Sequence, residues 1–253
     1  MEQLTATETA RWLAGAERIT VLTGAGISTE SGVPDFRGPQ GVWTKDPSAE
    51  ALFTIGNYLA DRDVRRRSWQ ARLNHPAWKA KPNAGHHAIA DLHRSGRLRG
   101  LVTQNIDGLH QLAGVPHEDV IEIHGTMHWV TCLSCDLRTP MPQVLARVEE
   151  GDDDPRCLGC GGIRKSATVF FGEMLDHAVL RAAVEVSTDC DVFIAVGTSL
   201  SVHPAAGLCD HARAAGAQLV VVNAEPTPYD ALATMVIREP ISEVLPCLAA
   251  AVC

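Results

Sequence analysis

The 253-residue sequence lacks any apolar run approaching the roughly 20 residues needed to cross a bilayer. Its first residues, MEQLTATETARW, also lack the basic and then apolar order of a secretion signal. These two absences predict a soluble, cytoplasmic protein with no membrane partner. Positive charge is scarce too, with 22 Lys and Arg against 30 Asp and Glu and a formal net charge of -8. Because nucleic-acid phosphates need a basic face, we expect no direct nucleic-acid binding, and a lysine-rich peptide suits the charge better.

A third absence concerns a glycine. The stretch TGAGISTESGVPDFRGPQGVW, residues 23–43, begins like a dinucleotide-binding fingerprint, because Gly24 and Gly26 follow a short apolar run. The third glycine of that fingerprint would fall at position 29, which holds Thr. Repeated Gly, Pro and Ser residues then predict a long irregular loop up to Trp43. The pattern therefore indicates a nucleotide site that differs from the usual dinucleotide fold.

The distribution of apolar runs indicates the fold class. Most runs are continuous rather than alternating, as in strands that are buried on both faces, and helical segments lie between most of them. Asn83 is a suitable N-cap for one such helix, which Gly96 ends. This order predicts an α/β fold with a doubly wound, Rossmann-like parallel sheet. The expected strands cover residues 19–23, 101–104, 120–123, 192–196 and 219–223.

Every expected strand is followed by polar residues. Turns alone explain any single case, but five such clusters together predict one ligand crevice, since ligands bind beyond the carboxyl ends of parallel strands. His124, at the end of VIEIH and before Gly125, is our candidate general base, with Asn105 and Asp107 nearby. The other histidines show no comparable setting, and His86-His87 is expected to be partly on the surface. The five clusters are GAGIS after residue 23, Asn105/Asp107/His110, His124-Gly125, Gly197-Thr198-Ser199 and Asn223-Ala224-Glu225.

Eight cysteines are present, and four of them form the pairs Cys132-x-x-Cys135 and Cys157-x-x-Cys160. Four thiolates in two such pairs close a tetrahedral zinc shell and leave no open position, which predicts one structural zinc ion. A redox dithiol and a nucleic-acid-binding zinc ribbon are the alternatives. Neither pair adjoins a redox-type strand and helix, and the segment between the pairs is acidic.

These motifs together resemble the sirtuin family of NAD-dependent protein-lysine deacylases. The matching stretches occur in family order: GAGISTESGVPDFRGPQGVW, TQNIDGLH, His124-Gly125, the CxxC pairs, VFFGE, GTSLSVHPAA and VNAEPTP. The resemblance implies an NAD-binding large domain, formed by residues 1–43, 83–125 and 172–253. It also implies a helical insertion at 44–82 and a smaller zinc-binding lobe at 126–171.

The resemblance also assigns roles to individual residues. His124, with Asn105 and Asp107, would form the catalytic group, and His124 would deprotonate the ribose hydroxyls after the acyl oxygen has attacked C1' and nicotinamide has left. Loop 28–43 would cover the reactive pocket. The residues implied to bind NAD are Gly24, Ala25, Gly26, Asp35, Phe36, Arg37, Trp43, Gln104, Asn105, Ile106, Asp107, Gly197, Thr198, Ser199, Asn223, Ala224, Glu225 and Ile241. Those implied to bind the acylated peptide by strand addition are Val169, Phe171, Gly172, Leu200, Ser201 and Val202.

One departure from the family bears on the acyl group. Relatives that prefer succinyl or malonyl lysine place Tyr and Arg three residues apart in the helical insertion, whereas no Tyr lies three residues before Arg65, Arg66 or Arg67. We therefore expect a preference for neutral acyl groups, acetyl first. Lys165-Ser166 is a second departure, since many relatives carry Arg-Pro there.

Three other functions are weighed against deacylation. Mono-ADP-ribosyl transfer would use the same NAD pocket and is the main alternative. A non-catalytic NAD-binding module would not need the base, yet His124, Asn105 and Asp107 are all present. A nucleic-acid-binding zinc ribbon is disfavoured by the acidic balance.

Overall fold

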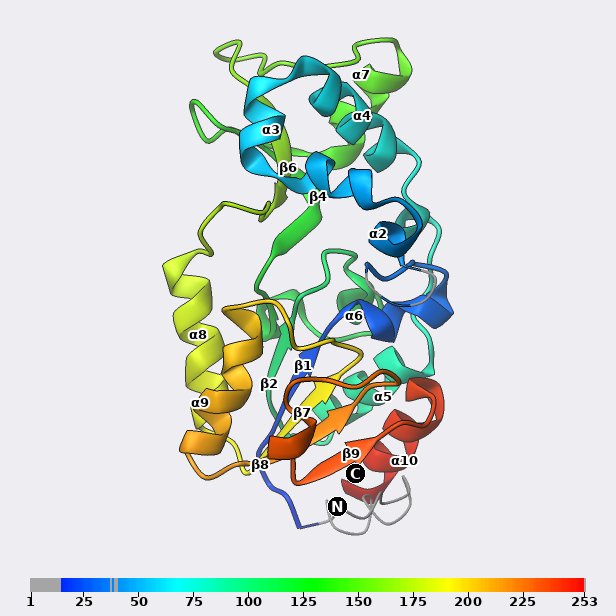
Figure 1. Ribbon diagram of the computed structural model, residues 1–253, viewed down its shortest axis with the longest axis vertical. Helices are drawn as coiled ribbons and strands as arrows, with labels where there is room; N and C mark the ends of the chain where they lie inside the picture. The colour runs from blue at the N-terminus through cyan, green and yellow to red at the C-terminus, as the bar shows by residue number, and fades with distance from the viewer. Residues whose placement is uncertain (1–14, 37, 39–40, 253) are drawn as a thin grey trace.

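A parallel sheet of six strands, in the order β3-β2-β1-β7-β8-β9, lies in the lower half of the molecule as Figure 1 shows it. The computed structural model describes residues 15–36, 38 and 41–252. The predicted doubly wound sheet is confirmed, and β9 is a strand that the sequence analysis did not expect. The strands are β1 (Ile19–Thr23), β2 (Leu98–Thr103), β3 (Val120–Glu122), β7 (Val192–Val196), β8 (Gln218–Val222) and β9 (Met235–Ile237).

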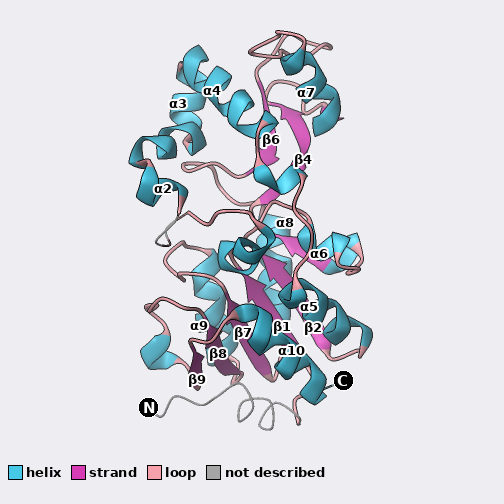
Figure 2. Cartoon of the chain, turned by 90° about the vertical axis from the view of Figure 1, so that its right-hand side faces the viewer, coloured by secondary structure: helices cyan, strands magenta, loops and turns pink. Residues whose placement is uncertain are grey.

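Helices cover both faces of this sheet (Figures 1 and 2). Helices α5 (Ala84–Arg94) and α10 (Ile241–Val252) pack on one face, and α8 (His177–Thr188) and α9 (Leu208–Ala214) pack on the other. Alternate residues of each strand point to opposite faces, so Val21 joins the first apolar core and Leu22 the second. This double burial explains why the strand sequences are continuously apolar.

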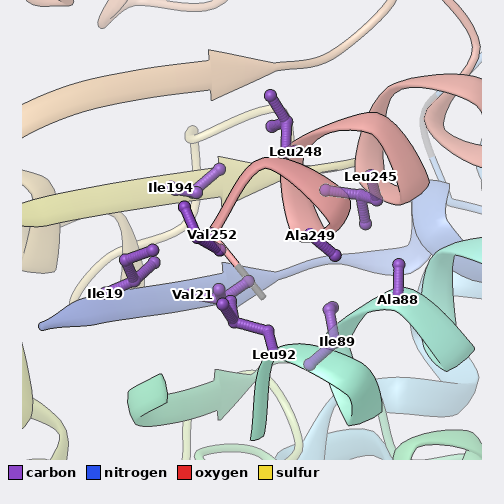
Figure 3. Close-up of a pocket in the computed structure, with 10 residues that line it drawn as sticks. All are labelled: Ile19, Val21, Ala88, Ile89, Leu92, Ile194, Leu245, Leu248, Ala249 and Val252. Carbon is purple, nitrogen blue, oxygen red and sulfur yellow. The ribbon is translucent and has the colours of Figure 1, made fainter. Parts of the chain in front are cut away.

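The core beneath α5 and α10 contains a small void of about 20 Å³ (Figure 3). Its lining is apolar and includes Val21, Ile89 and Leu245. A bound water needs several polar partners, so this void is a packing gap rather than a ligand site.

A second, antiparallel sheet of three strands forms the smaller lobe, in the order β5-β4-β6. Its strand β4 (Gly125–Cys132) begins directly after His124, and β6 (Arg164–Thr168) ends directly before Val169. The backbone N–H of Val169 donates to the carbonyl of His124 at 2.8 Å, so both ends of the lobe meet beside the candidate base. The lobe also contains β5 (Arg138–Pro140) and α7 (Met141–Glu149).

The helical insertion packs on the smaller lobe, away from the main sheet (Figure 1). Trp69 lies in one apolar cluster with Val130 and Met141. Arg65 and Asp154 form a buried ion pair at 3.0 Å between the two segments. The insertion contains α2 (Val42–Lys45), α3 (Ile55–Ala60), α4 (Arg62–Leu73) and the 3-10 helices Pro47–Phe53 and Pro76–Trp78.

The loop expected to be irregular up to Trp43 is partly helical. Residues Ala25–Ser31 form a 3-10 helix, η1, whose end is marked by Gly32 at φ 84°. The prediction missed it because the i to i+3 bonds of a 3-10 helix need no 3.6-residue apolar period. Helix α6 (Leu109–Leu112) and three further 3-10 helices, His117–Asp119, Ala205–Gly207 and Asp230–Leu232, complete the elements of the described residues. Within the described ranges, no helix is both long and apolar enough to cross a membrane.

Candidate active site at the sheet switch point

The strand order reverses between β1 and β7, and the glycine turn lies at this point. Gly26 N–H donates to Gly197 O at 2.8 Å, and Gly24 N–H donates to Val196 O at 2.9 Å. A Cβ on Gly26 would lie 2.7 Å from the Cα of Gly197, which itself has φ +59°. No larger residue fits this contact without displacing backbone. In doubly wound folds, the crevice at this reversal is where ligands bind.

Residues after β2 complete a polar network with the glycine turn. Asn105 donates from Nδ2 to Gly24 O at 3.1 Å and to Ser28 Oγ at 3.2 Å. Ser28 Oγ in turn donates to Asp107 Oδ2 at 2.8 Å. Burial raises the pKa of Asp107, although the Leu109 N–H and Ser28 hydroxyl favour its carboxylate. Ser28 lies within GAGIS, but the sequence analysis did not single it out.

His124 enters the same crevice from the end of β3. Its Nδ1 lies 3.2 Å from the carbonyl oxygen of Gln104, which can only accept a hydrogen bond. Nδ1 therefore carries the proton, and Nε2 keeps a free lone pair for proton abstraction. Burial lowers the pKa of His124, and the Gln104 carbonyl partly opposes this shift. A neutral imidazole near physiological pH is the form that a general base needs.

Gln104 connects His124 to the glycine turn. Its Nε2 donates to Thr198 Oγ1 at 2.9 Å, and its backbone N–H donates to Thr23 O at 2.9 Å. The structure therefore brings together the ends of β1, β2, β3 and β7, as the sequence predicted.

Two buried histidines lie beneath this network, and for one of them the sequence expectation was wrong. His86 was expected to be partly on the surface, but it is fully buried, and only His87 is exposed. The His86 and His110 rings lie 5.0 Å apart, and His110 Nε2 contacts Thr23 Oγ1 at 2.9 Å. Burial lowers the pKa of His86 to about 4 and that of His110 to about 3. Both rings are therefore neutral at physiological pH.

The loop beside the crevice carries an aromatic cluster. Phe36 lies 4.8 Å from Trp43 and 6.1 Å from Phe53, and Trp43 lies 5.4 Å from Phe171. Asp35 Oδ1 accepts the N–H of Gly38 at 3.1 Å, which fixes the turn. The predicted site residue Arg37 lies outside the described residues.

The remaining predicted NAD contacts lie at other strand ends. Asn223 follows β8, and its Nδ2 donates to Glu225 O at 2.7 Å across Ala224. Ser199 follows β7 beside Thr198, and Ile241 begins α10 near Gly85. The backbone of Ile106 is bound to Met127 of β4 at 3.0 Å.

The predicted peptide-binding residues occupy two segments, 169–172 after β6 and 200–202 after β7. Phe171 is already paired, since its N–H donates to Phe53 O at 2.7 Å and its carbonyl accepts from Ile55 N at 3.0 Å. Its backbone therefore joins this segment to the helical insertion. Leu200 is buried at φ 51°, and Ser201 is exposed.

Lys165 and Glu173, which the sequence analysis did not connect, fix the 170–173 turn. Lys165 Nζ lies 2.9 Å from Glu173 Oε2, and Glu173 also accepts the N–H of Phe170 at 2.7 Å. Lys165 is buried. Burial lowers its pKa, and the hydrogen bond and charge of Glu173 partly oppose this shift. Lys165, which stands where many relatives carry Arg, therefore holds the 170–173 turn through Glu173.

The four cysteines of the two pairs come together in the smaller lobe. Their Sγ atoms all lie within 4.8 Å of one another, as Cys132 with Cys160 at 3.5 Å and Cys135 with Cys157 at 3.7 Å illustrate. Backbone N–H groups of Cys160 and Gly159 lower the pKa of Cys157 to about 6, which favours its thiolate. Four sulfur donors at this spacing fit a tetrahedral zinc ion.

The fold and site define a class of protein: a doubly wound domain with a buried polar network and a histidine at its switch point, and an inserted four-cysteine lobe. The chain belongs to the Sir2 family, whose sequence pattern matches residues 24–204. The resemblance to sirtuins is thus confirmed.

Two relatives illustrate the similarity. The chain is 56% identical over 236 residues to "NAD-dependent protein deacetylase 2" of Streptomyces coelicolor, covering 93% of this chain and 98% of that protein. It is 42% identical over 242 residues to "NAD-dependent protein deacetylase 1" of Pyrobaculum aerophilum, covering 94% and 91%.

Solved structures are also similar over nearly the whole chain. One is a Sir2 variant with a deacetylated p53 peptide and 3'-O-acetyl ADP ribose, at 34% identity and a TM-score of 0.89, covering 98% of both chains. Another is Sir2 with a p53 peptide and NAD+, at 34% identity and a TM-score of 0.85, covering 96% of both chains.

The buried histidines predict an acid-sensitive fold. Below pH 6.5 the unfolded chain takes up protons at His86 and His110 that the folded chain refuses. The unfolded state then binds more protons than the folded state. As the pH is lowered, the free energy of unfolding therefore decreases by up to roughly 1.4 kcal/mol per pH unit for each histidine. Above pH 6.5 this contribution is fully present. Urea unfolding of the His110→Gln variant between about pH 6.5 and 4.5 should show a slope shallower by that amount.

The control is His177→Gln, which removes an exposed histidine that does not influence the pKa of either buried ring. The part of the pH slope that the two buried rings cause should remain in this variant. An unchanged slope in His110→Gln would mean that His110 is not a neutral buried group.

Proposed function

We propose that this chain is an NAD-dependent protein-lysine deacetylase, which releases nicotinamide, free lysine and O-acetyl-ADP-ribose. The observation that carries this proposal is the meeting of the Gly24–Gly26 turn, Asp107 and His124 at the switch point of the sheet. The activity named for relatives that match almost end to end supports it.

NAD would lie along the carboxyl ends of the strands. In this proposal, the short backbone at 24–26 approaches the pyrophosphate, and Gly197–Ser199 contact the adjoining phosphate or ribose. Asn223, Glu225 and Ile241 bind the adenosine end, and Asn105 and Asp107 hold the nicotinamide carboxamide. NAD supplies the electrophilic C1' carbon that the acyl oxygen attacks.

His124 acts as the general base. Its free Nε2 takes the proton of a ribose hydroxyl, and the Gln104 carbonyl at Nδ1 stabilises the positive ring that results. The proton on Nδ1 stays in place during this step, because the Gln104 carbonyl only accepts a hydrogen bond and does not take the proton. Only the neutral ring performs this step, so the depressed pKa of His124 keeps the base available at neutral pH.

The loop 28–43 excludes water from the breaking glycosidic bond. Phe36 and Trp43, whose rings contact Phe53 and Phe171 edge-on or tilted, form its apolar side toward the helical insertion. An apolar cover of this kind prevents hydrolysis of NAD without a substrate. Ala25, Asp35, Arg37, Gln104 and Ile106 complete the proposed pocket.

The acetylated peptide adds as a strand between Val169–Gly172 and Leu200–Val202, which recognises backbone more than sequence. The four-cysteine lobe holds zinc as a structural ion, because four thiolates leave no open coordination position. In this scheme 1–43, 83–125 and 172–253 form the NAD-binding domain, with 44–82 and 126–171 as insertions. In this proposal the protein acts on proteins with acylated lysines and binds no nucleic acid directly. It works in the cytoplasm, and cell fractionation tests this location.

The direct test is incubation of the purified protein with an acetyl-lysine peptide, with and without NAD. We expect acetyl loss only with NAD, inhibited by nicotinamide. His124→Gln should lower kcat/KM by roughly 10² to 10⁴, the usual contribution of a general base. In the parent protein, kcat/KM should fall as pH drops through a value below 6.5, since protonation removes the base.

The exposed His177, at the start of α8, supplies the matched control, and His177→Gln should retain full activity. NAD-independent acetyl loss, or full activity in His124→Gln, would contradict the proposal. Radiolabelled adenine retained on protein instead of in O-acetyl-ADP-ribose would favour mono-ADP-ribosyl transfer.

We further propose a preference for neutral acyl groups. Arg65 is paired with Asp154, and Arg66 with Asp63 and Asp153, so these arginines are engaged with other carboxylates. Both tyrosine hydroxyls are also engaged, because Tyr58 donates to Arg164 O at 2.6 Å and Tyr229 to Asp210 Oδ2 at 2.6 Å.

A panel of acetyl, propionyl and succinyl peptides tests this preference. Acetyl-lysine should be turned over at least about tenfold faster than succinyl-lysine, because an unpaired carboxylate is costly to bury. Arg72 is the buried arginine of α4 that stacks on Phe170, with a guanidinium-to-ring distance of 5.6 Å. Faster succinyl turnover that Arg72→Met abolishes would contradict the preference.

A further inference from the structure

Arg164 is a buried cation on the face of β6 next to the cysteine cluster. It pairs in register with Cys132 of β4 across the antiparallel ladder, and residues opposed in this way have Cβ atoms about 5 Å apart. Arg164 is only 3% exposed. Its Nε and Nη2 atoms are buried and, within the described part of the chain, have no hydrogen-bond partner.

The neighbouring groups that favour the charged form of Arg164 are cysteines. Burial lowers its pKa, Cys157, Cys132 and Cys135 oppose that shift, and Arg147 adds to it. Arg147 itself is occupied, since it pairs with Asp152 and donates to the carbonyl of Arg156 at 2.9 Å. Among the described ion pairs, none involves Arg164. An uncompensated buried charge of this kind is strongly destabilising.

The cysteine cluster supplies the missing charge once it holds metal. A Zn²⁺ ion with four thiolates has a net charge of -2, which a neighbouring cation can balance. We propose that Arg164 is the counter-ion of the zinc–tetrathiolate centre and acts through its positive charge beside the cysteines.

Arg164 is a positioning residue in this account, not a zinc ligand. A cation beside metal-bound thiolates reduces the charge that the thiolates must share. The backbone of the same residue joins the lobe to the helical insertion, because the Arg164 carbonyl accepts the Tyr58 hydroxyl. Loss of the positive charge should therefore weaken zinc binding although all four cysteine ligands remain.

Zinc binding is measured without NAD or peptide, by competition with a coloured chelator and by the rate of chelator-driven release. Arg164→Met, which removes the charge and keeps the length of the side chain, should lower apparent zinc affinity about 10-fold to 100-fold, as loss of outer-shell partners does elsewhere. Arg164→Lys keeps the charge and should lie closer to the parent protein than to Arg164→Met. The result does not depend on whether the protein deacetylates lysine.

Arg138→Met is the matched control, since Arg138 lies in the same lobe but stacks on Trp129 at 5.2 Å. It should retain parental zinc affinity. An Arg164→Met affinity within about twofold of the parent, or an equal loss in Arg138→Met, would overturn the proposal. If Arg164→Met does not fold, as judged by circular dichroism, Arg164→Gln in the same assay serves with the same two outcomes.

Discussion

The close contact between the glycine turn and β7 is the constraint on which the rest of the site depends. Gly24 and Gly26 touch the backbone of Gly197 and Thr198 so closely that a Cβ on either glycine would overlap them. This contact brings the turn to the point where the strand order reverses. Asn105 then bonds Gly24, and Gln104 bonds Thr198, so the residues after β2 and β3 are positioned relative to the turn.

The inserted lobe extends this arrangement outward. It leaves the main sheet at His124 and returns at Val169, which bonds the carbonyl of His124. The position of the proposed base is therefore coupled to the lobe. Two buried arginines lie in or against this lobe: Arg65 of the helical insertion, which pairs with Asp154, and Arg164, which lies opposite Cys132.

Much of this arrangement was predictable from local sequence. Continuous apolar runs located five of the six strands, because a strand covered on both faces needs apolar residues at every position. The polar strand ends and the cysteine pairs indicated the crevice and the metal cluster. Burial of His86 and His110 was not predictable, since it results from the packing of α5 and α6 on each other, and the Lys165–Glu173 pair depends on a turn. Roles of the individual site residues stay predictions.

The central claim is that one nucleotide touches both the glycine turn and the region of His124. Hydrogen–deuterium exchange of the parent protein, with and without NAD, tests it most directly. Protection on NAD binding should rise together in segments 24–28, 104–107, 124–125 and 197–199. Protection confined to the glycine turn, with the His124 segment unchanged at saturating NAD, would contradict the account.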